Sequence, residues 1–125
     1  MSDALGRLRR RADFLRIAGA RRKWATPGLI LQVSPTPDTG GRNPAPRVGF
    51  TVTRRVGAAV VRNRAKRRLR AVTRAVLAEH GARGHDFVVI GRKGTLERPY
   101  DALVADLENA LHKLKVWRNG ENGPK

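Results

Sequence analysis

One basic segment carries the side chains best suited to binding a polyanion. Residues 60–74 read VVRNRAKRRLRAVTR, and at about 100° per residue the apolar side chains of this segment share one narrow sector of a helix. The other positions include seven cations and an asparagine: Arg62, Asn63, Arg64, Lys66, Arg67, Arg68, Arg70 and Arg74. So many neighbouring cations repel one another unless a polyanion neutralises them. The segment therefore predicts an amphipathic helix whose outer face binds phosphate groups.

Groups that could perform catalysis are sparse. The 10 Asp and Glu residues form no close sequence cluster of the kind that holds two metal ions at a phosphodiesterase site. His80, His85 and His112 lack the spacing of metal ligands, and a structural or solvated role is favoured for His80 and His112. Asp86 is expected to be a turn or capping residue. We predict no catalytic residue and no metal site, although clustering of distant residues in space stays open.

The overall charge also favours a nucleic-acid partner. The chain has 27 Lys and Arg residues against 10 Asp and Glu, a formal net charge of +17. A nucleic acid explains this excess better than an anionic membrane surface does. No apolar run approaches the ~18 residues of a membrane span, and the charged N-terminus is unlike a signal peptide. With no cysteine to form disulfides, the chain is expected to be soluble and cytoplasmic.

Hydrophobic periodicity and turn residues predict one α+β domain over residues 1–125, with a folded core at 8–116 and loose ends. The expected helices lie at residues 8–18, from 60 to Gly81 or Gly84, and at 100–114. The expected strands lie at residues 29–33, 47–53 and 85–90, with one further strand allowed before the basic helix. The predicted order is αβββαβα, and the proline-rich residues 34–46 form a surface loop.

The basic helix and the strand before it together resemble a known family signature. Residues 48–70 read VGFTVTRRVGAAVVRNRAKRRLR and closely resemble the signature of the bacterial ribonuclease P protein subunit, whose core is RNR at 62–64 followed by KRR at 66–68. Asp-Phe at 13–14 and Asp-Phe-Val-Val at 86–89 extend the resemblance.

The sequence also departs from the family's pattern. The strand ends in Thr53-Arg54-Arg55, where the family more often has a small residue and two lysines. Ala18 and Leu31 stand where the family can have aromatic residues.

The resemblance implies a role beside a catalytic RNA. In this family the RNA subunit of ribonuclease P holds Mg²⁺ and removes the 5′ leader of precursor tRNA. The protein binds both RNAs, holds no tightly bound cofactor, and is an electrostatic and positioning partner. No membrane and no obligate protein partner are expected. The resemblance also implies a small sheet with a left-handed βαβ crossover around the basic helix, against the usual right-handed rule.

Two binding surfaces are predicted. The resemblance assigns the face of the basic helix to the RNA subunit: Arg62, Asn63, Arg64, Lys66, Arg67, Arg68 and Arg70. A partly structural role stays open for Arg68, which borders the apolar sector. The resemblance assigns the leader to a cleft between the first helix and the sheet, with Phe14, Arg54, Arg55 and, more weakly, Leu31 as contacts. Phe14 has a second interpretation, because an aromatic residue in an amphipathic helix is usually part of the core.

Three other classes of protein remain open. Composition and the basic helix alone fit a ribosomal or nucleoid protein equally well, and only the combined motif disfavours it. An endonuclease with its own active site is the second alternative. A helix-turn-helix DNA-binding protein is the third, but strands on both sides of the basic helix fit it poorly.

Overall fold

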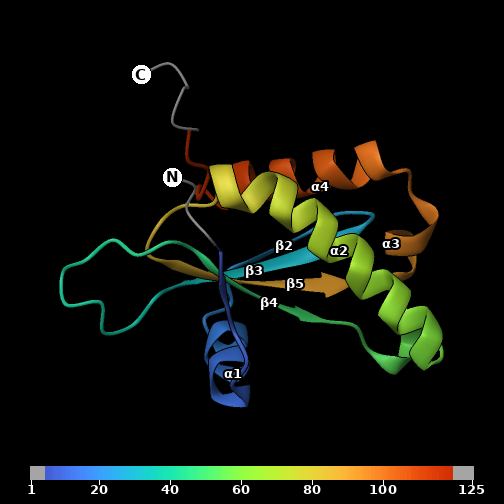
Figure 1. Cartoon of the computed structure of the whole chain (residues 1–125), viewed down its shortest axis with the longest axis horizontal. Coiled ribbons are helices and arrows are strands. Elements are labelled where there is room, and N and C mark those ends of the chain that lie inside the picture. The colour runs from blue at the N-terminus through green and yellow to red at the C-terminus, as the bar shows by residue number, and fades with distance from the viewer. Residues whose placement is uncertain (1–4, 120–125) are drawn as a thin grey trace.

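The computed structural model describes residues 5–119, which form one mixed five-stranded sheet packed between helices (Figure 1). The strands are β1 (Gly6–Arg7), β2 (Lys23–Ala25), β3 (Leu29–Pro35), β4 (Arg47–Thr51) and β5 (His85–Gly91). The helices are α1 (Arg11–Gly19), α2 (Ala59–His80), α3 (Lys93–Glu97) and α4 (Tyr100–Lys113), with a 3₁₀ turn η1 (Arg54–Val56) before α2. The order of strands across the sheet is β1-β4-β5-β3-β2.

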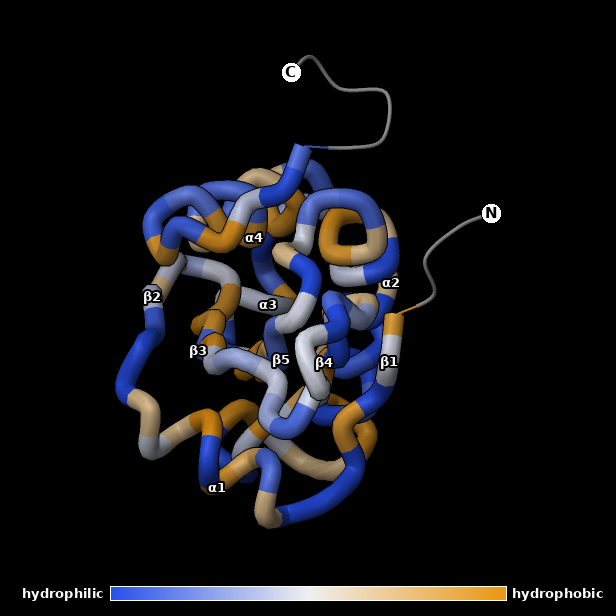
Figure 2. The backbone as a smooth tube through the Cα atoms, turned by 90° about the vertical axis from the view of Figure 1, so that its left-hand side faces the viewer, coloured by the Kyte–Doolittle hydropathy of each residue, from blue (hydrophilic) through white to orange (hydrophobic). Residues whose placement is uncertain are grey.

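The two faces of the sheet are covered unequally. Figure 2 shows α2 and α4 on one face and α1 on the other. The main core lies on the α2 and α4 side, where Leu31, Leu69 and Phe87 are fully buried. The cluster under α1 is much smaller and consists of Leu8, Ile17 and Val88, with Phe14 and Ile90 packed against it. Because α1 is short, it leaves part of its face of the sheet uncovered.

The basic helix connects two parallel neighbours of the sheet. β4 and β5 pair in parallel with Phe50 opposite Val89, and α2 carries the chain back between them. In Figure 1 both strands point right and α2 lies above the sheet; in Figure 2, which is seen from the left of Figure 1, β4 lies to the right of β5 and is thus nearer the viewer of Figure 1. The crossover is therefore left-handed, which confirms the expectation and departs from the general rule.

A glycine fixes the turn into α2. Gly57 has a φ of 155°, and a Cβ there would lie 2.8 Å from a methyl carbon of Val61. That region of backbone conformation is essentially restricted to glycine. Once the helix begins, Ala65, Leu69, Val72 and Val76 are buried against the core, as the periodicity predicts.

The predicted α+β class is confirmed, but details of the first helix are wrong. Leu8 does not belong to α1: it follows β1, and its N–H donates to the Val48 carbonyl at 2.9 Å. Leu15, which shares the helical spacing of Leu8 and Ala12, is 59% exposed, whereas Ile17 is fully buried. β4 also ends at Thr51 rather than at residue 53.

Short elements and chain ends account for the other differences. β1 and α3 were not predicted, because two or five residues carry too little periodicity. The expectation of loose ends falls partly outside the described residues. Inside them it is wrong, since Gly6 and Arg7 form β1 and Trp117 pairs with Gly81. None of the helices within residues 5–119 has the length and hydropathy needed to cross a membrane.

Candidate nucleic-acid interface

The face of α2 that points away from the sheet is an array of free cations. Asn63, Arg64, Arg67 and Arg74 are all exposed. Within residues 5–119, none of these three arginines forms an ion pair with a carboxylate. Their guanidinium groups stay hydrated and available, so this face can accept phosphates without first breaking an internal contact.

Cations on the flanks of α2 are used differently. Arg68 donates from Nη1 to the Leu96 carbonyl at 3.0 Å and from Nη2 to the Arg98 carbonyl at 2.8 Å. These two bonds hold the C-terminal end of α3 against α2. Arg68 therefore has the partly structural role that stayed open for it, and two of its five N–H groups are engaged in that role.

Arg62, Lys66 and Arg70 are half-buried. Arg62 donates to the Gly57 carbonyl at 2.9 Å, across the turn that starts α2. The guanidinium carbon of Arg70 lies 5.9 Å from the centre of the Phe50 ring, a cation–π contact. These three residues therefore flank the free cations and keep part of their charge at the surface.

On the opposite face, α1 and the sheet enclose a cleft of about 510 Å³. Its lining combines two cations with apolar and polar side chains: Arg9, Arg11, Phe14, Leu15, Ala18, Gln32, Phe50, Thr51, Val88 and Ile90. A cleft of this kind combines aromatic surface for stacking with positive charge.

Phe14 belongs both to the core and to the cleft. It packs against the small cluster of Leu8, Ile17 and Val88, is half-buried, and also lines the cleft. A Cβ on Gly49 would lie 2.5 Å from Cζ of Phe14, so only glycine lets the ring approach β4 this closely. The two interpretations of Phe14 are thus compatible.

A second hollow of about 640 Å³ adjoins the cleft at Ile90. Three of its lining residues are cations: Arg55, Arg92 and Lys93. Arg55, which was predicted as a leader contact, thus lies beside the cleft and not in its lining. Arg54 is exposed in η1 but lines neither hollow.

Leu31 does not contact the cleft. It is fully buried in the main core, on the face of β3 turned toward α4. Because side chains alternate along a strand, the next residue, Gln32, faces the cleft instead. The prediction of Leu31 as a leader contact is wrong by one residue, and the alternation within residues 29–33 is the signal that could have indicated Gln32. Arg92 and Lys93 were also missed, because they follow β5 without any motif.

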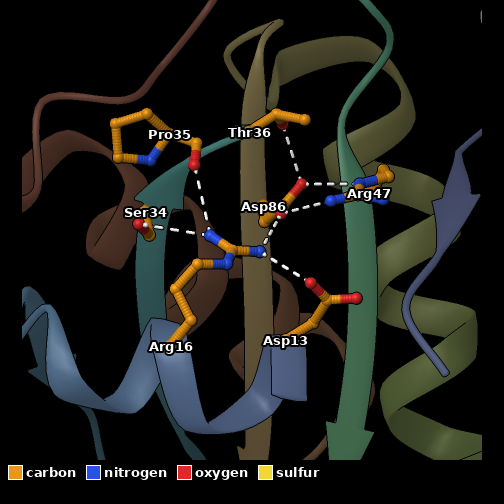
Figure 3. A network of polar contacts seen from close by, with 7 residues as sticks. All are labelled: Asp13, Arg16, Ser34, Pro35, Thr36, Arg47 and Asp86. Atoms are coloured by element: carbon orange, nitrogen blue, oxygen red, sulfur yellow. Dashed lines mark hydrogen bonds and ion pairs between the residues drawn. The ribbon is translucent and has the colours of Figure 1, made fainter. Parts of the chain in front are cut away.

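A buried carboxylate fixes α1 over the sheet (Figure 3). Asp86 on β5 has a fully buried side chain and accepts from Arg47 at 2.8 and 2.6 Å, from Arg16 at 2.6 Å and from Thr36 at 2.8 Å. Arg16 also bonds Asp13, one turn before it in α1. Asp86 was expected in a turn or a cap, and that expectation is wrong. It joins α1 to β5 and to the start of β4.

Hydrogen bonding keeps Asp86 ionised despite its burial. Burial alone would raise the pKa of its carboxyl group, but the hydrogen bonds from Arg47, Thr36 and Arg16 together outweigh burial and lower the pKa below its ordinary value. The hydrogen bond to Asp86 is likewise the largest cause that raises the pKa of Arg47. The network of Asp13, Arg16, Thr36, Arg47 and Asp86, which we call the Asp86 latch, is therefore charged at neutral pH.

The histidines and carboxylates form no metal centre in the described part of the chain. No group of three or more His, Asp or Glu side chains in residues 5–119 could hold a metal ion. The rings of His80 and His112 stack on the two sides of Trp117, at centroid distances of 4.0 and 4.2 Å. This placement gives both histidines the structural role that was favoured for them.

Comparisons with known proteins agree with this architecture. The family model described as Ribonuclease P matches residues 3–115. The ribonuclease P protein component of Paramagnetospirillum magneticum is 54% identical over 114 residues, covering 91% of this chain and 86% of that protein. The ribonuclease P protein component of Gluconacetobacter diazotrophicus is 49% identical over 116 residues, covering 93% and 97%.

Solved structures show the same fold. The RNase P protein from Thermotoga maritima superposes with a TM-score of 0.65 at 28% identity, covering 82% of this chain and 92% of that chain. The Staphylococcus aureus RNase P protein superposes with a TM-score of 0.72 at 24% identity, covering 92% and 100%, a likeness of fold alone. The combination of cationic helix, left-handed crossover and cleft is thus that of an RNA-binding class of small α+β proteins. The chain belongs to the ribonuclease P protein family.

Proposed function

We propose that this chain is the protein subunit of ribonuclease P and assists an RNA-catalysed removal of the 5′ leader from precursor tRNA. The single observation that carries the proposal is the division of the binding groups between two faces of one sheet. Free arginines cover the outer face of α2, and an aromatic cleft lies under α1. One face suits a folded RNA, and the other suits a single strand.

In this proposal α2 binds the catalytic RNA subunit. The contacts are Asn63, Arg64 and Arg67, with Arg62, Lys66 and Arg70 at the flanks. Arginine binds phosphate oxygens through two parallel hydrogen bonds, and Asn63 offers both a donor and an acceptor to a 2′-hydroxyl group or a base edge. Arg68 supports this surface from inside the fold through its bonds to α3.

The cleft under α1 receives the leader. The ring of Phe14 provides a stacking surface that demands no particular base, and Arg55 lies at the adjoining hollow to neutralise phosphates. The protein contributes no catalytic residue. Mg²⁺ is held mainly by the RNA, and the protein's charge reduces the Mg²⁺ concentration that two interacting RNAs require.

Cleavage of precursor tRNA at low millimolar Mg²⁺, by the cognate RNA subunit with and without this protein, tests the proposal. Protein alone serves as the control. Strong stimulation by the protein, with no cleavage by protein alone, is the expected result. Tight RNA binding without stimulation would favour a structural RNA-binding protein, and cleavage by protein alone would reveal an active site in this chain.

A further inference from the structure

The floor of the cleft continues across the sheet onto its edge strand. Thr51 on β4 is paired with Ile90 on β5, Ile90 with Ile30 on β3, and Ile30 with Ala25 on β2. Directly paired residues point to the same face of a sheet. With neighbouring strands ~4.8 Å apart, this row extends roughly 14 Å across the sheet. The row starts in the cleft and ends on β2.

Lys23 carries positive charge to the end of this floor. It is paired with Gln32, which lines the cleft, so the two side chains share the α1 face. β2 is the outermost strand of the sheet, and Figure 2 shows it at the opposite edge from β1 and α2. Every residue of β2 is exposed.

An exposed tryptophan lies just over this edge. Trp24 follows Lys23, is paired with Leu31 and is 39% exposed. It points to the α4 face, where Nζ of Lys113 lies 5.5 Å from the centre of its ring. Stacking surface and positive charge therefore coincide at the end of the row, as in proteins that bind single-stranded nucleic acid.

The ends of two helices place further cations near the start of β2. Arg21 and Lys115 each follow a helix in the left-handed conformation, both with a φ of 61°. Arg22 donates to the Leu114 carbonyl at 2.6 Å and so ties the end of α4 to the start of β2. Arg21, Lys23, Lys113 and Lys115 are exposed, and none of them forms an ion pair within residues 5–119.

We propose that this β2 edge, made of Lys23, Trp24 and Lys113, binds leader nucleotides upstream of those held in the cleft. The proposal rests on the proposed function. Continuity with the cleft floor favours the leader over the RNA subunit, because the cationic face of α2 lies at the other side of the sheet. A strand leaving the cleft across β2 meets Lys23 first and can then stack a base on Trp24.

The test measures the affinity of the assembled holoenzyme for precursor tRNAs whose leaders are lengthened one nucleotide at a time. The wild-type affinity should rise first as the cleft fills, and again at the length that reaches Trp24. Trp24→Ala should abolish the second rise, a loss of about tenfold for long leaders, and leave short leaders unchanged. Trp24→Phe should retain most of the second rise.

Matched controls separate stacking from general effects. Tyr100→Ala removes another exposed aromatic residue, at the far end of α4, and should leave both rises intact. Circular dichroism checks the fold, and Lys23→Gln with Lys113→Gln tests the same edge if Trp24→Ala does not fold. Trp117→Phe leaves Trp24 as the chain's one tryptophan, and its fluorescence should be quenched only by long leaders.

Each other outcome has a definite meaning. Equal losses for all leader lengths, or no loss at all, would overturn the β2 edge as a leader site. A loss of affinity for the RNA subunit alone would assign the edge to that RNA instead. A failure of the proposed function would give a different result. The wild type would then lack the first rise in affinity as well, and Phe14→Ala would have no such rise to remove.

Discussion

The outer face of α2 and the contact between α1 and the sheet use the same residue type, arginine, in opposite ways. On α2, Arg64 and Arg67 are exposed and have no carboxylate partner in the described chain. Under α1, Arg16 and Arg47 are bound to a buried carboxylate, and their role is to hold a helix over a sheet. Arginines without a carboxylate partner contribute binding affinity that salt weakens, whereas ion-paired arginines hold the elements of the fold in place. The presence of a carboxylate partner, and not the charge of the arginine itself, therefore decides whether the arginine is available to bind RNA.

The largest expected effect follows from breaking the Asp86 latch. Asp86→Asn removes a buried charge and leaves Arg16 and Arg47 without their anion. Breaking a buried pair costs about 3–5 kcal/mol, and the lower end is expected here because both arginines can reach water. Urea denaturation should show a loss of about 3 kcal/mol in the free energy of unfolding. Asp13→Asn is the matched control and should cost less than about 1 kcal/mol, since within residues 5–119 the Asp13 side chain pairs only with Arg16 and is partly exposed.

The same latch predicts how stability depends on pH. The pKa of Asp86 is lowered in the folded protein, so its contribution is complete above the unfolded pKa of about 4 and is lost as pH falls through the folded value. The wild type should therefore lose more stability than Asp86→Asn between neutral and acidic pH. Parallel losses in the two proteins would show that Asp86 is not the group that titrates.

On the α2 face, the variant Arg64→Ala/Arg67→Ala should weaken binding to the RNA subunit. Each lost phosphate contact reduces the slope of log affinity against log salt by ~0.7 to ~0.9, so the double variant should lower it by about 1.5. Titrations at several salt concentrations measure this slope. Arg42→Ala, in the loop before β4, removes an exposed charge elsewhere and should change the slope little. An unaltered slope in the double variant would exclude direct phosphate contacts by these two arginines.

Arg68→Ala distinguishes the structural cation from its free neighbours. It removes two hydrogen bonds to carbonyl groups of the α3 segment, at a cost of about 1–3 kcal/mol in unfolding free energy. The salt dependence of RNA-subunit binding should stay close to that of the wild type. A drop in that slope without a loss of stability would return Arg68 to the binding face.

The smallest expected effect concerns the contact between Arg70 and Phe50. Phe50→Leu keeps an apolar side chain but removes the ring under the guanidinium group, and such contacts contribute about 0.5–1 kcal/mol at exposed sites. Thermal unfolding should shift by a few degrees at most. A larger shift would mean that Phe50 acts mainly as a core residue beside Val48.

The sequence predicted the parts of the fold that repeat along the chain. The apolar spacing of Ala65, Leu69 and Val72 located α2 and its buried side, and the cations opposite them located the exposed face. These predictions succeeded because a 22-residue helix contains several periods of the pattern. The face of the sheet on which Leu31 lies was predicted wrongly. In β3 large apolar residues alternate with Ile30 and Gln32, and Ile30 is apolar as well. The polarity of Gln32 was therefore the sole local sign of which face is turned toward the cleft.

Partners distant in sequence could not be predicted. Nothing near Asp86 indicates that Arg47 and Arg16, 39 and 70 residues away, will surround it. Likewise, the bonds from Arg68 to the carbonyls of residues 96 and 98 depend on where α3 lies, and α3 itself was not expected. The crossover hand also came from family resemblance, since no pattern in the residues specifies it.

One comparison tests most directly whether the two faces of the sheet serve two different RNAs. The ratio of holoenzyme affinities for precursor and mature tRNA is measured for Phe14→Ala and for Arg64→Ala/Arg67→Ala, with the RNA subunit saturated by protein. Phe14→Ala should lower the ratio about tenfold at intact fold, because it removes a stacking surface for the leader. The arginine variant should keep the wild-type ratio once saturated. Equal reductions of the ratio in both variants would contradict the division of labour between the two faces.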